Sequence, residues 1–238
     1  MTTLTLGRRE RLREATFREI KDAARDILIK KGRQAVSFNA VARQIGISGP
    51  ALYRYFPSYD ELIASLTSDF FNELTAAIIN ARKKADGLQV PLVVMSRAMR
   101  TWAISHPQEF ALMFASETSP ITQTPIDSAT NGAGEEFGRL FLDEVGAIWH
   151  SQPFPVPKLE DMPPTHVKQL QAYSRKINEL LPPEAAHVFL SCWVRLYGLL
   201  CMEVLRQLEF ALCDVEPLYE ECLQQLCHTL GLEYKSPV

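Results

Sequence analysis

Residues 37–56 read SFNAVARQIGISGPALYRYF and carry two short apolar patterns joined by a glycine. Ser37 is a good N-cap for a helix over residues 38–45, because its side-chain oxygen can accept a backbone N–H of the first turn. Gly46 can take the left-handed conformation that ends this helix, and Ser48 can cap a second short helix. Two short helices joined by a tight turn that contains glycine predict a helix-turn-helix.

The second helix of this motif has an unusual composition for a helix with a purely structural role. Its first turn, Gly49-Pro50-Ala51, is small enough to enter a DNA major groove deeply. Tyr53 and Tyr55 can hydrogen-bond to phosphates, and Arg54 can make a forked contact with a phosphate or a guanine. The motif therefore indicates DNA binding, while a helical hairpin inside a bundle remains the structural alternative.

The distribution of charge supports the DNA-binding interpretation, although the total charge does not. The net charge is −3, from 25 basic and 28 acidic residues, and this value alone argues against a nucleic-acid partner. However, residues 1–57 hold 12 Lys or Arg and 5 Asp or Glu, whereas residues 58–238 hold 13 and 23. A net charge of +7 at one end and −10 on the rest predicts a polyanionic partner for the N-terminal end only.

The remaining sequence is periodic at the spacing of helices, and no run alternates as a strand would. Residues 116–133 are rich in Thr, Ser, Pro and Gly and predict a loop, and the five prolines in 151–164 predict an extended segment that serves as a surface loop or a lid. We expect an all-α chain of about ten helices. The predicted helices are 10–31, 38–45, a short one beginning at residue 49 and closed by Pro57, 59–85, 89–105, 107–115, 134–150, 166–181, 183–209 and 214–230.

These residues resemble the TetR-type family of transcriptional regulators over about residues 14–66. The matching features are Gly32, Ser37, Val41-Ala42, Gly46-Ile47-Ser48, Leu52-Tyr53-Arg54-Tyr55-Phe56 and Asp60-Glu61-Leu62. The resemblance implies an N-terminal helix-turn-helix domain, here 10–58, and a C-terminal helical domain, here 59–238, that senses a ligand and dimerises. The DNA-contacting residues that follow from the motif and the resemblance are Ser37, Ser48, Gly49, Pro50, Ala51, Tyr53, Arg54, Tyr55 and Tyr59.

Tyr59 departs from the family pattern, which usually has Lys at this position beside a phosphate. A tyrosine can donate a hydrogen bond there but brings no charge, so we expect a shallower salt dependence from this contact. The arginines at positions 8, 9, 11 and 13 could compensate for the missing charge, or they could belong to a solvated terminus.

The C-terminal residues predict a dimer interface. Residues 183–209 are apolar on most sides of a helix, so this helix needs cover from more than one neighbour. Gly198 would allow a second helix to approach closely. A four-helix homodimer interface would form from the helices over residues 183–209 and 214–230 and their copies in a second subunit, related by a two-fold axis. A monomeric core is the alternative.

A ligand site is predicted among aromatic and methionine side chains of the middle helices. Such side chains suit a small apolar or aromatic effector, although the same pattern is also typical of an ordinary core. Trp193, Tyr197 and Gly198, with the upstream residues 106–114, resemble a subclass that carries a Trp…His-Gly motif, but Tyr197 replaces its histidine. The candidate ligand-binding residues are Met99, Trp102, Phe110, Phe114, Phe137, Phe141, Phe189, Trp193 and Tyr197.

Other functional classes find little support. The chain lacks a Gly-rich phosphate loop, a nucleophile elbow and a zinc-binding His-Glu-Xaa2-His helix, so we expect no enzyme and no catalytic residue. Cys222, Cys227 and His228 do not converge as metal ligands, so we expect no metal and no cofactor. An odd number of cysteines without an export signal or a membrane span predicts a cytoplasmic protein without a membrane partner.

The sequence therefore predicts a ligand-responsive, sequence-specific DNA-binding regulator, most simply a repressor that a small effector releases from a palindromic operator. The alternative is a helical protein–protein interaction module that binds no specific DNA.

Overall fold

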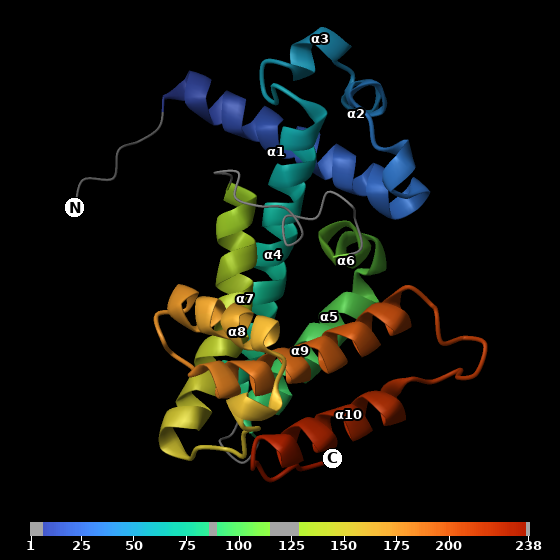
Figure 1. The fold of residues 1–238 in the computed structure, drawn as a ribbon. Coiled ribbons are helices and arrows are strands. Elements are labelled where there is room, and N and C mark those ends of the chain that lie inside the picture. The colour runs from blue at the N-terminus through green and yellow to red at the C-terminus, as the bar shows by residue number, and fades with distance from the viewer. Residues whose placement is uncertain (1–6, 86–89, 115–128, 237–238) are drawn as a thin grey trace. The chain divides into compact units, whose positions relative to one another are not determined.

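The computed structural model describes residues 7–85, 90–114 and 129–236, and these residues form helices without any strand (Figure 1). The all-α prediction is therefore confirmed. The helices are α1 (Arg8–Lys31), α2 (Phe38–Ile45), α3 (Gly49–Leu52), α4 (Tyr59–Lys84), α5 (Pro91–Ser105), α6 (Pro107–Phe114), α7 (Ala129–Ser151), α8 (Pro164–Lys176), α9 (Pro183–Val204) and α10 (Glu216–Thr229), with short 3₁₀ turns at Arg33–Ala35 and Leu159–Asp161.

Side-chain caps begin the two helices on either side of α3. The backbone N–H of Ala40 donates to Ser37 Oγ at 3.2 Å, and that of Glu61 donates to Ser58 Oγ at 3.1 Å. Gly46 ends α2 in the left-handed region at φ 73°, a conformation that costs glycine little. These local signals fix the beginning and end of α2 and the start of α4, which all lie where the sequence places them.

Four boundaries differ from the sequence-based prediction by more than two residues. α3 ends at Leu52, because Arg54 N and Tyr55 N bond back to Ala51 and Leu52 in turns and not in a continuing helix. α7 begins at Ala129, so the predicted loop 116–133 is wrong at its end; its residues up to 128 lie outside the described part. α8 ends at Lys176 and not near residue 181. α9 ends at Val204 and not near residue 209.

The proline-rich segment 151–164 is anchored to the body by an aromatic contact. Phe154 is buried, and its ring lies 4.9 Å from the ring of Trp149. The flanking prolines prevent a helix, and the buried phenyl ring holds the extended backbone in place.

The chain packs as two compact units, and α4 runs from one into the other. The N-terminal unit comprises Met1–Phe71 and Gln108–Gly134, and the C-terminal unit comprises Asn72–Pro107 and Glu135–Val238. The functional division at residue 58 stays a prediction. By packing, however, α6 belongs with the helix-turn-helix residues, where Arg25 Nε of α1 donates to the buried carboxylate of Glu109 at 3.3 Å.

Two arginines of α5 tie the C-terminal unit together. Arg97 makes a forked pair with Glu220 of α10, with distances of 2.9 and 2.7 Å, and Arg100 binds Glu203 of α9 at 2.7 Å. Burial raises the pKa of the Tyr219 hydroxyl, which donates to the backbone oxygen of Ser96 at 2.7 Å. These contacts hold α5, α9 and α10 in a defined arrangement around one core.

By length and composition alone, α4 and α9 could each cross a membrane. In the most apolar 18-residue stretch of each helix, 50% is buried inside the protein for α4 and 39% for α9. Core helices of water-soluble bundles have the same composition, so this property is weak evidence. The absence of a membrane partner stays a prediction.

The environment of the cysteines predicts which thiol reacts first. Burial raises the pKa of Cys192 and of Cys227 to about 11, so both thiols stay protonated near neutral pH. Cys213 is exposed. We expect iodoacetamide at pH 8 to alkylate Cys213 in the native protein and to spare Cys192 and Cys227, as peptide mass spectrometry would show. Urea should expose all five cysteines; fast native labelling of Cys192 would contradict the described packing.

Candidate DNA-binding surface and effector site

A small apolar core holds the helix-turn-helix together. Val41 and Leu52 are fully buried, and Phe56 stacks on Phe17 of α1 with ring centroids 4.4 Å apart. The N–H of Ile47 donates to the carbonyl of Ala42 at 3.0 Å and closes the turn after α2. The short α3 is thus held by two buried side chains, Leu52 at its last position and Phe56 four residues later.

The first turn of α3 leaves the surface open. Pro50 is exposed and Gly49 and Ala51 are half-buried, so no large side chain covers this end of the helix. A Cβ atom at Gly49 would lie 3.2 Å from the Asn39 Oδ1 atom of α2, so the glycine permits a close approach of the two helices.

The predicted DNA-contacting side chains differ in their exposure. Tyr53 is 60% exposed, and its ring packs edge-on against Phe38 of α2 at 4.8 Å. Ser37, Ser48 and Arg54 are also exposed, whereas Tyr55 and Tyr59 are half-buried. Arg54 lies in the turn after α3 and not on the helix itself, which corrects its expected setting.

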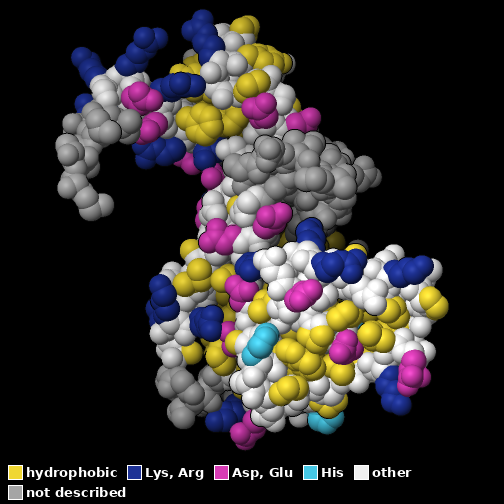
Figure 2. Space-filling model, turned by 60° about the vertical axis from the view of Figure 1, so that its left-hand side comes forward, with side chains coloured by type: hydrophobic (Ala, Val, Ile, Leu, Met, Phe, Trp, Pro, Cys, Tyr) yellow, Lys and Arg dark blue, Asp and Glu magenta, His cyan; other side chains and the backbone are white. Residues whose placement is uncertain are grey.

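Basic side chains surround this surface. Figure 2 shows Lys and Arg side chains prominent around the N-terminal helices at the top of the view. Arg43 and Arg54 are exposed and form no ion pair within the described part of the chain. Unpaired guanidinium groups beside an open helix end can bind phosphates without first breaking an internal contact.

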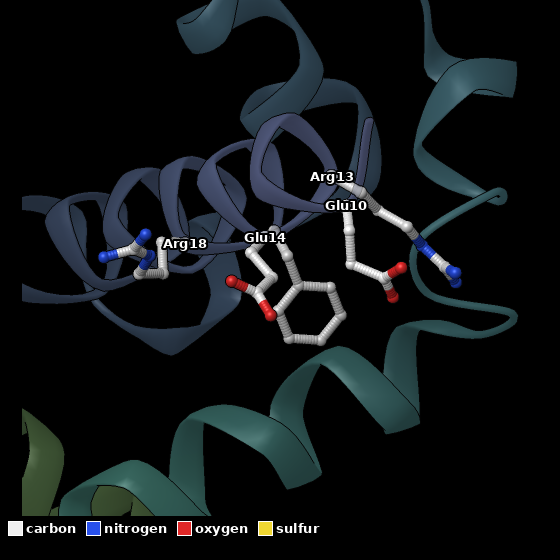
Figure 3. Close-up of a pocket in the computed structure, with 5 residues that line it drawn as sticks. Glu10, Arg13, Glu14 and Arg18 are labelled. Carbon is white, nitrogen blue, oxygen red and sulfur yellow. The ribbon is translucent and has the colours of Figure 1, made fainter. Parts of the chain in front are cut away.

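A wide concavity of about 410 Å³ lies along α1, lined by Glu10, Arg13, Glu14, Phe17 and Arg18. Figure 3 shows that Arg13 and Arg18 point outward on opposite sides of Glu14. The lining mixes both signs of charge along a single helix, and Phe17 already stacks on Phe56. This concavity therefore lacks the apolar walls from several elements that small-molecule sites usually have.

The C-terminal unit contains a cluster of aromatic side chains between α7 and α9. The ring of Trp193 lies 5.9 Å from Phe137 and 5.4 Å from Phe141, and it stacks on Tyr197 at 5.8 Å with nearly parallel planes. Burial raises the pKa of the Tyr197 hydroxyl, so this group stays neutral. Four of the predicted ligand-binding residues are thus brought together around Trp193.

A small apolar cavity of about 30 Å³ adjoins this cluster. Its walls come from α5, α7, α9 and α10, and Ser96 contributes the only hydroxyl among them. A space of this size accepts about one water molecule, so a ligand can enter only if the helices separate. The lining residues are Leu92, Ser96, Phe141, Val145, Phe189, Cys192, Trp193, Leu196, Leu226 and Leu230.

The other predicted ligand-binding residues lie elsewhere. Met99 and Trp102 are buried on α5, where Trp102 stacks on His106 at 4.7 Å. Phe110 and Phe114 belong to the N-terminal unit, and Phe114 packs edge-on against Phe71 of α4 at 5.3 Å. The nine predicted residues are therefore divided between the two compact units.

Several lining residues of the cavity were not predicted as ligand-binding residues. Leu196, Leu226 and Val145 follow the ordinary helical spacing of core residues, so the sequence carries no signal that separates them from other core positions. Ser96 is the exception, because a hydroxyl within an apolar stripe is a detectable anomaly. Its Oγ donates to the carbonyl of Leu92 at 2.8 Å.

Comparisons with known proteins agree with this architecture. Residues 20–66 match the family of bacterial regulatory proteins, tetR family, and residues 92–226 match the tetracyclin repressor-like C-terminal domain. HTH-type transcriptional regulators of Mycobacterium bovis and Mycobacterium tuberculosis are 31% identical over 147 residues. The aligned segment spans 61% of this chain and 62% of those relatives.

Solved structures share the fold over most of the chain. The regulatory protein SCO4313 is 29% identical, with a TM-score of 0.70 over 93% of this chain and 100% of its own. RolR in complex with its ligand resorcinol is 13% identical, with a TM-score of 0.54 over 95% of this chain and 99% of its own, and is similar in fold. With a helix-turn-helix in place and more than half of the chain matching the C-terminal domain, this chain belongs to the TetR family of bacterial regulatory proteins.

Proposed function

We propose that this protein is a cytoplasmic, homodimeric repressor that binds a palindromic operator and is released by a small apolar or aromatic effector. The observation that supports DNA binding most directly is the first turn of α3, which carries no large side chain. Exposed Tyr53 and Arg54 follow it, and Leu52 is buried. Each subunit would place α3 in one major groove, with half-sites about one helical turn apart. The contacts would come from Ser37, Ser48, Gly49, Pro50, Ala51, Tyr53, Arg54, Tyr55 and Tyr59.

The distribution of charge supports the same orientation on DNA. The +7 charge of residues 1–57 attracts phosphates, and the −10 charge of residues 58–238 repels them. The N-terminal helices would therefore approach the duplex first, and the C-terminal unit would stay in solution.

The effector would bind beside Trp193. The aromatic cluster and the adjoining cavity combine apolar walls from four helices with the Ser96 hydroxyl and no charged group, which suits an uncharged, partly aromatic molecule. Since the cavity is only about 30 Å³, binding requires α7 and α9 to separate. That separation would tilt α4, which is continuous through both units, and would change the spacing of the two recognition helices.

The dimer would form through α9 and α10. Val194, Met202 and Leu218 expose 65%, 40% and 37% of their surface, respectively, on these helices. A Cβ atom added at Gly198 would meet no atom within 4 Å, so the close approach that this glycine permits is not used within one subunit. Figure 2 shows hydrophobic side chains gathered over the C-terminal helices.

A titration tests the proposed function. Fluorescently labelled DNA from the region flanking the protein's own gene is titrated at several salt concentrations, with random duplex of equal length as the control. Operator binding predicts an affinity at least about 10³-fold tighter than for random duplex. Equal affinities would refute the operator claim and would favour the helical interaction module.

Tyr53, which is exposed, and Tyr55, which is half-buried, give a residue-level prediction. Replacing Tyr53 and Tyr55 together by Phe removes two hydroxyl donors but keeps both rings, so the fold should remain. We expect operator DNA and random duplex to be bound more weakly by similar factors, about tenfold, because phosphate contacts carry no sequence information. Anisotropy titrations on single-base operator variants provide the measurement. A loss confined to one base pair would assign these tyrosines to base recognition.

A further inference from the structure

Phe210 is held in solvent by an ordered loop. It lies in the connection between α9 and α10, and 87% of its surface is exposed, the largest fraction among the large hydrophobic side chains of the described residues. An exposed phenyl ring in a folded protein loses the free energy that its burial would supply. Such a ring is available to a partner surface, where its burial would supply this free energy.

The loop is fixed by its own hydrogen bonds. Gln207 N donates to the Met202 carbonyl at 2.8 Å, and Leu212 N donates to that of Leu208 at 2.9 Å. Arg206 takes the left-handed conformation at φ 59°, which is uncommon for a residue with a side chain, and its guanidinium pairs with Glu209. These contacts hold the backbone on both sides of Phe210.

The two helices that this loop connects carry a groove that could receive a ring from another molecule. A concavity of about 450 Å³ lies between α9 and α10, lined by Arg195, Gln224, Gln225, His228 and Thr229. The Arg195 guanidinium donates to the Gln225 side chain, which holds it across the groove. A guanidinium held in this way can stack on the face of an aromatic ring.

We infer that Phe210 of each subunit docks into the Arg195 groove of a second copy of this chain. The groove lies near the middle of α9 and the end of α10, whereas Phe210 lies beyond the end of α9, so one chain cannot make the contact within itself. A two-fold axis perpendicular to α9 brings the loop of one copy to the middle of the other. If Phe210 meets Arg195 in both directions, the axis passes midway between these two residues of one copy.

This inference rests on the proposed dimer and adds its anchor. The groove lies on the same two helices, α9 and α10, as the exposed apolar residues Val194, Met202 and Leu218 of the proposed interface. Aromatic side chains that fill a pocket on the partner carry most of the binding free energy in many interfaces, and charged neighbours at the rim carry little. Phe210 would therefore dominate the stability of the dimer.

The first test measures the dimer dissociation constant by sedimentation. If the dimer is too tight for dissociation to be detected, the rate of subunit exchange between labelled copies is measured instead. Phe210→Ala should raise this constant at least about tenfold. The matched control is Ile104→Ala, which removes a 44% exposed side chain from α5, and it should change the constant less than twofold. An unchanged constant for Phe210→Ala would overturn the inference.

A double-mutant cycle then tests the receptor groove. Arg195→Ala alone should raise the dimer dissociation constant. Phe210→Ala should then raise this constant by a clearly smaller factor in the Arg195→Ala variant than in the natural chain, because the stacking partner is already gone. Strictly additive effects would show that Phe210 docks elsewhere and would refute the proposed groove.

The outcomes separate this inference from the proposed function. A dimer that depends on Phe210 but has no preference for operator DNA would refute the repressor and keep the anchor. A monomeric natural chain would refute both the dimer and the anchor, whereas specific DNA binding by a dimer insensitive to Phe210 would refute the anchor alone.

Discussion

Replacing Leu52 by Ala should unfold the helix-turn-helix locally and abolish specific DNA binding. The Leu52 side chain is fully buried on the last residue of α3, a helix of only four residues that has no side-chain cap at its start. Truncating a fully buried leucine typically costs about 2–5 kcal/mol. A helix this short cannot replace the loss with other contacts, so the N-terminal unit should lose most of its local stability.

Hydrogen exchange gives the measurement for this variant. Amides of α1 to α3 should exchange faster by roughly 30-fold or more, as 2 kcal/mol corresponds to that factor. The three tryptophans, at positions 102, 149 and 193, lie outside the N-terminal unit, so their fluorescence should stay native and serve as an internal control. Leu12→Ala is the matched variant, since Leu12 is 61% exposed on α1. Equal exchange in both variants would show that Leu52 does not anchor α3.

The sequence predicts best those features that one or two neighbouring residues determine. Ser37 and Ser58 cap the helices that they precede, and Gly46 ends α2, because a hydroxyl or a missing Cβ acts within one turn. The end of α3 was predicted less well. Arg54 and Tyr55 have no helix-breaking chemistry, and the turn forms there because Phe56 reaches into the core beside Phe17.

Packing between distant segments is where the sequence carries least information. Trp102, Phe110 and Trp193 all appear in apolar stripes, yet the structure places them in three different surroundings. An apolar stripe shows that a helix face is buried but not which helix covers it. The same limit explains why the division of the chain by packing, within α4, differs from the predicted functional division at residue 58.

The position of α6 within the N-terminal unit leads to the second large effect. The Glu109 carboxylate is only 3% exposed, and its contact with Arg25 of α1 is partly shielded from water. The Arg25 guanidinium also lies over the ring of Phe70, 5.0 Å from its centroid. Arg25→Met keeps the aliphatic stem but leaves the buried carboxylate without its cation, and removing one partner of a buried pair typically costs about 3–5 kcal/mol. We expect hydrogen exchange in α1 and α6 to accelerate by two orders of magnitude or more.

Two further variants decide whether the buried charge is the cause. Lys21→Met breaks the ion pair between Lys21 of α1 and Asp69 of α4. The Asp69 carboxylate is 39% exposed and can be solvated, so this variant should lose only about 0–1 kcal/mol of stability. Adding Glu109→Gln to Arg25→Met removes the unpaired charge and should restore part of the lost protection of α1 and α6 against hydrogen exchange. If the double variant is no more stable than Arg25→Met alone, the loss comes from the contact with Phe70 and not from the isolated carboxylate. In that case α6 is held to α1 mainly by apolar packing, and the ion pair contributes only alignment.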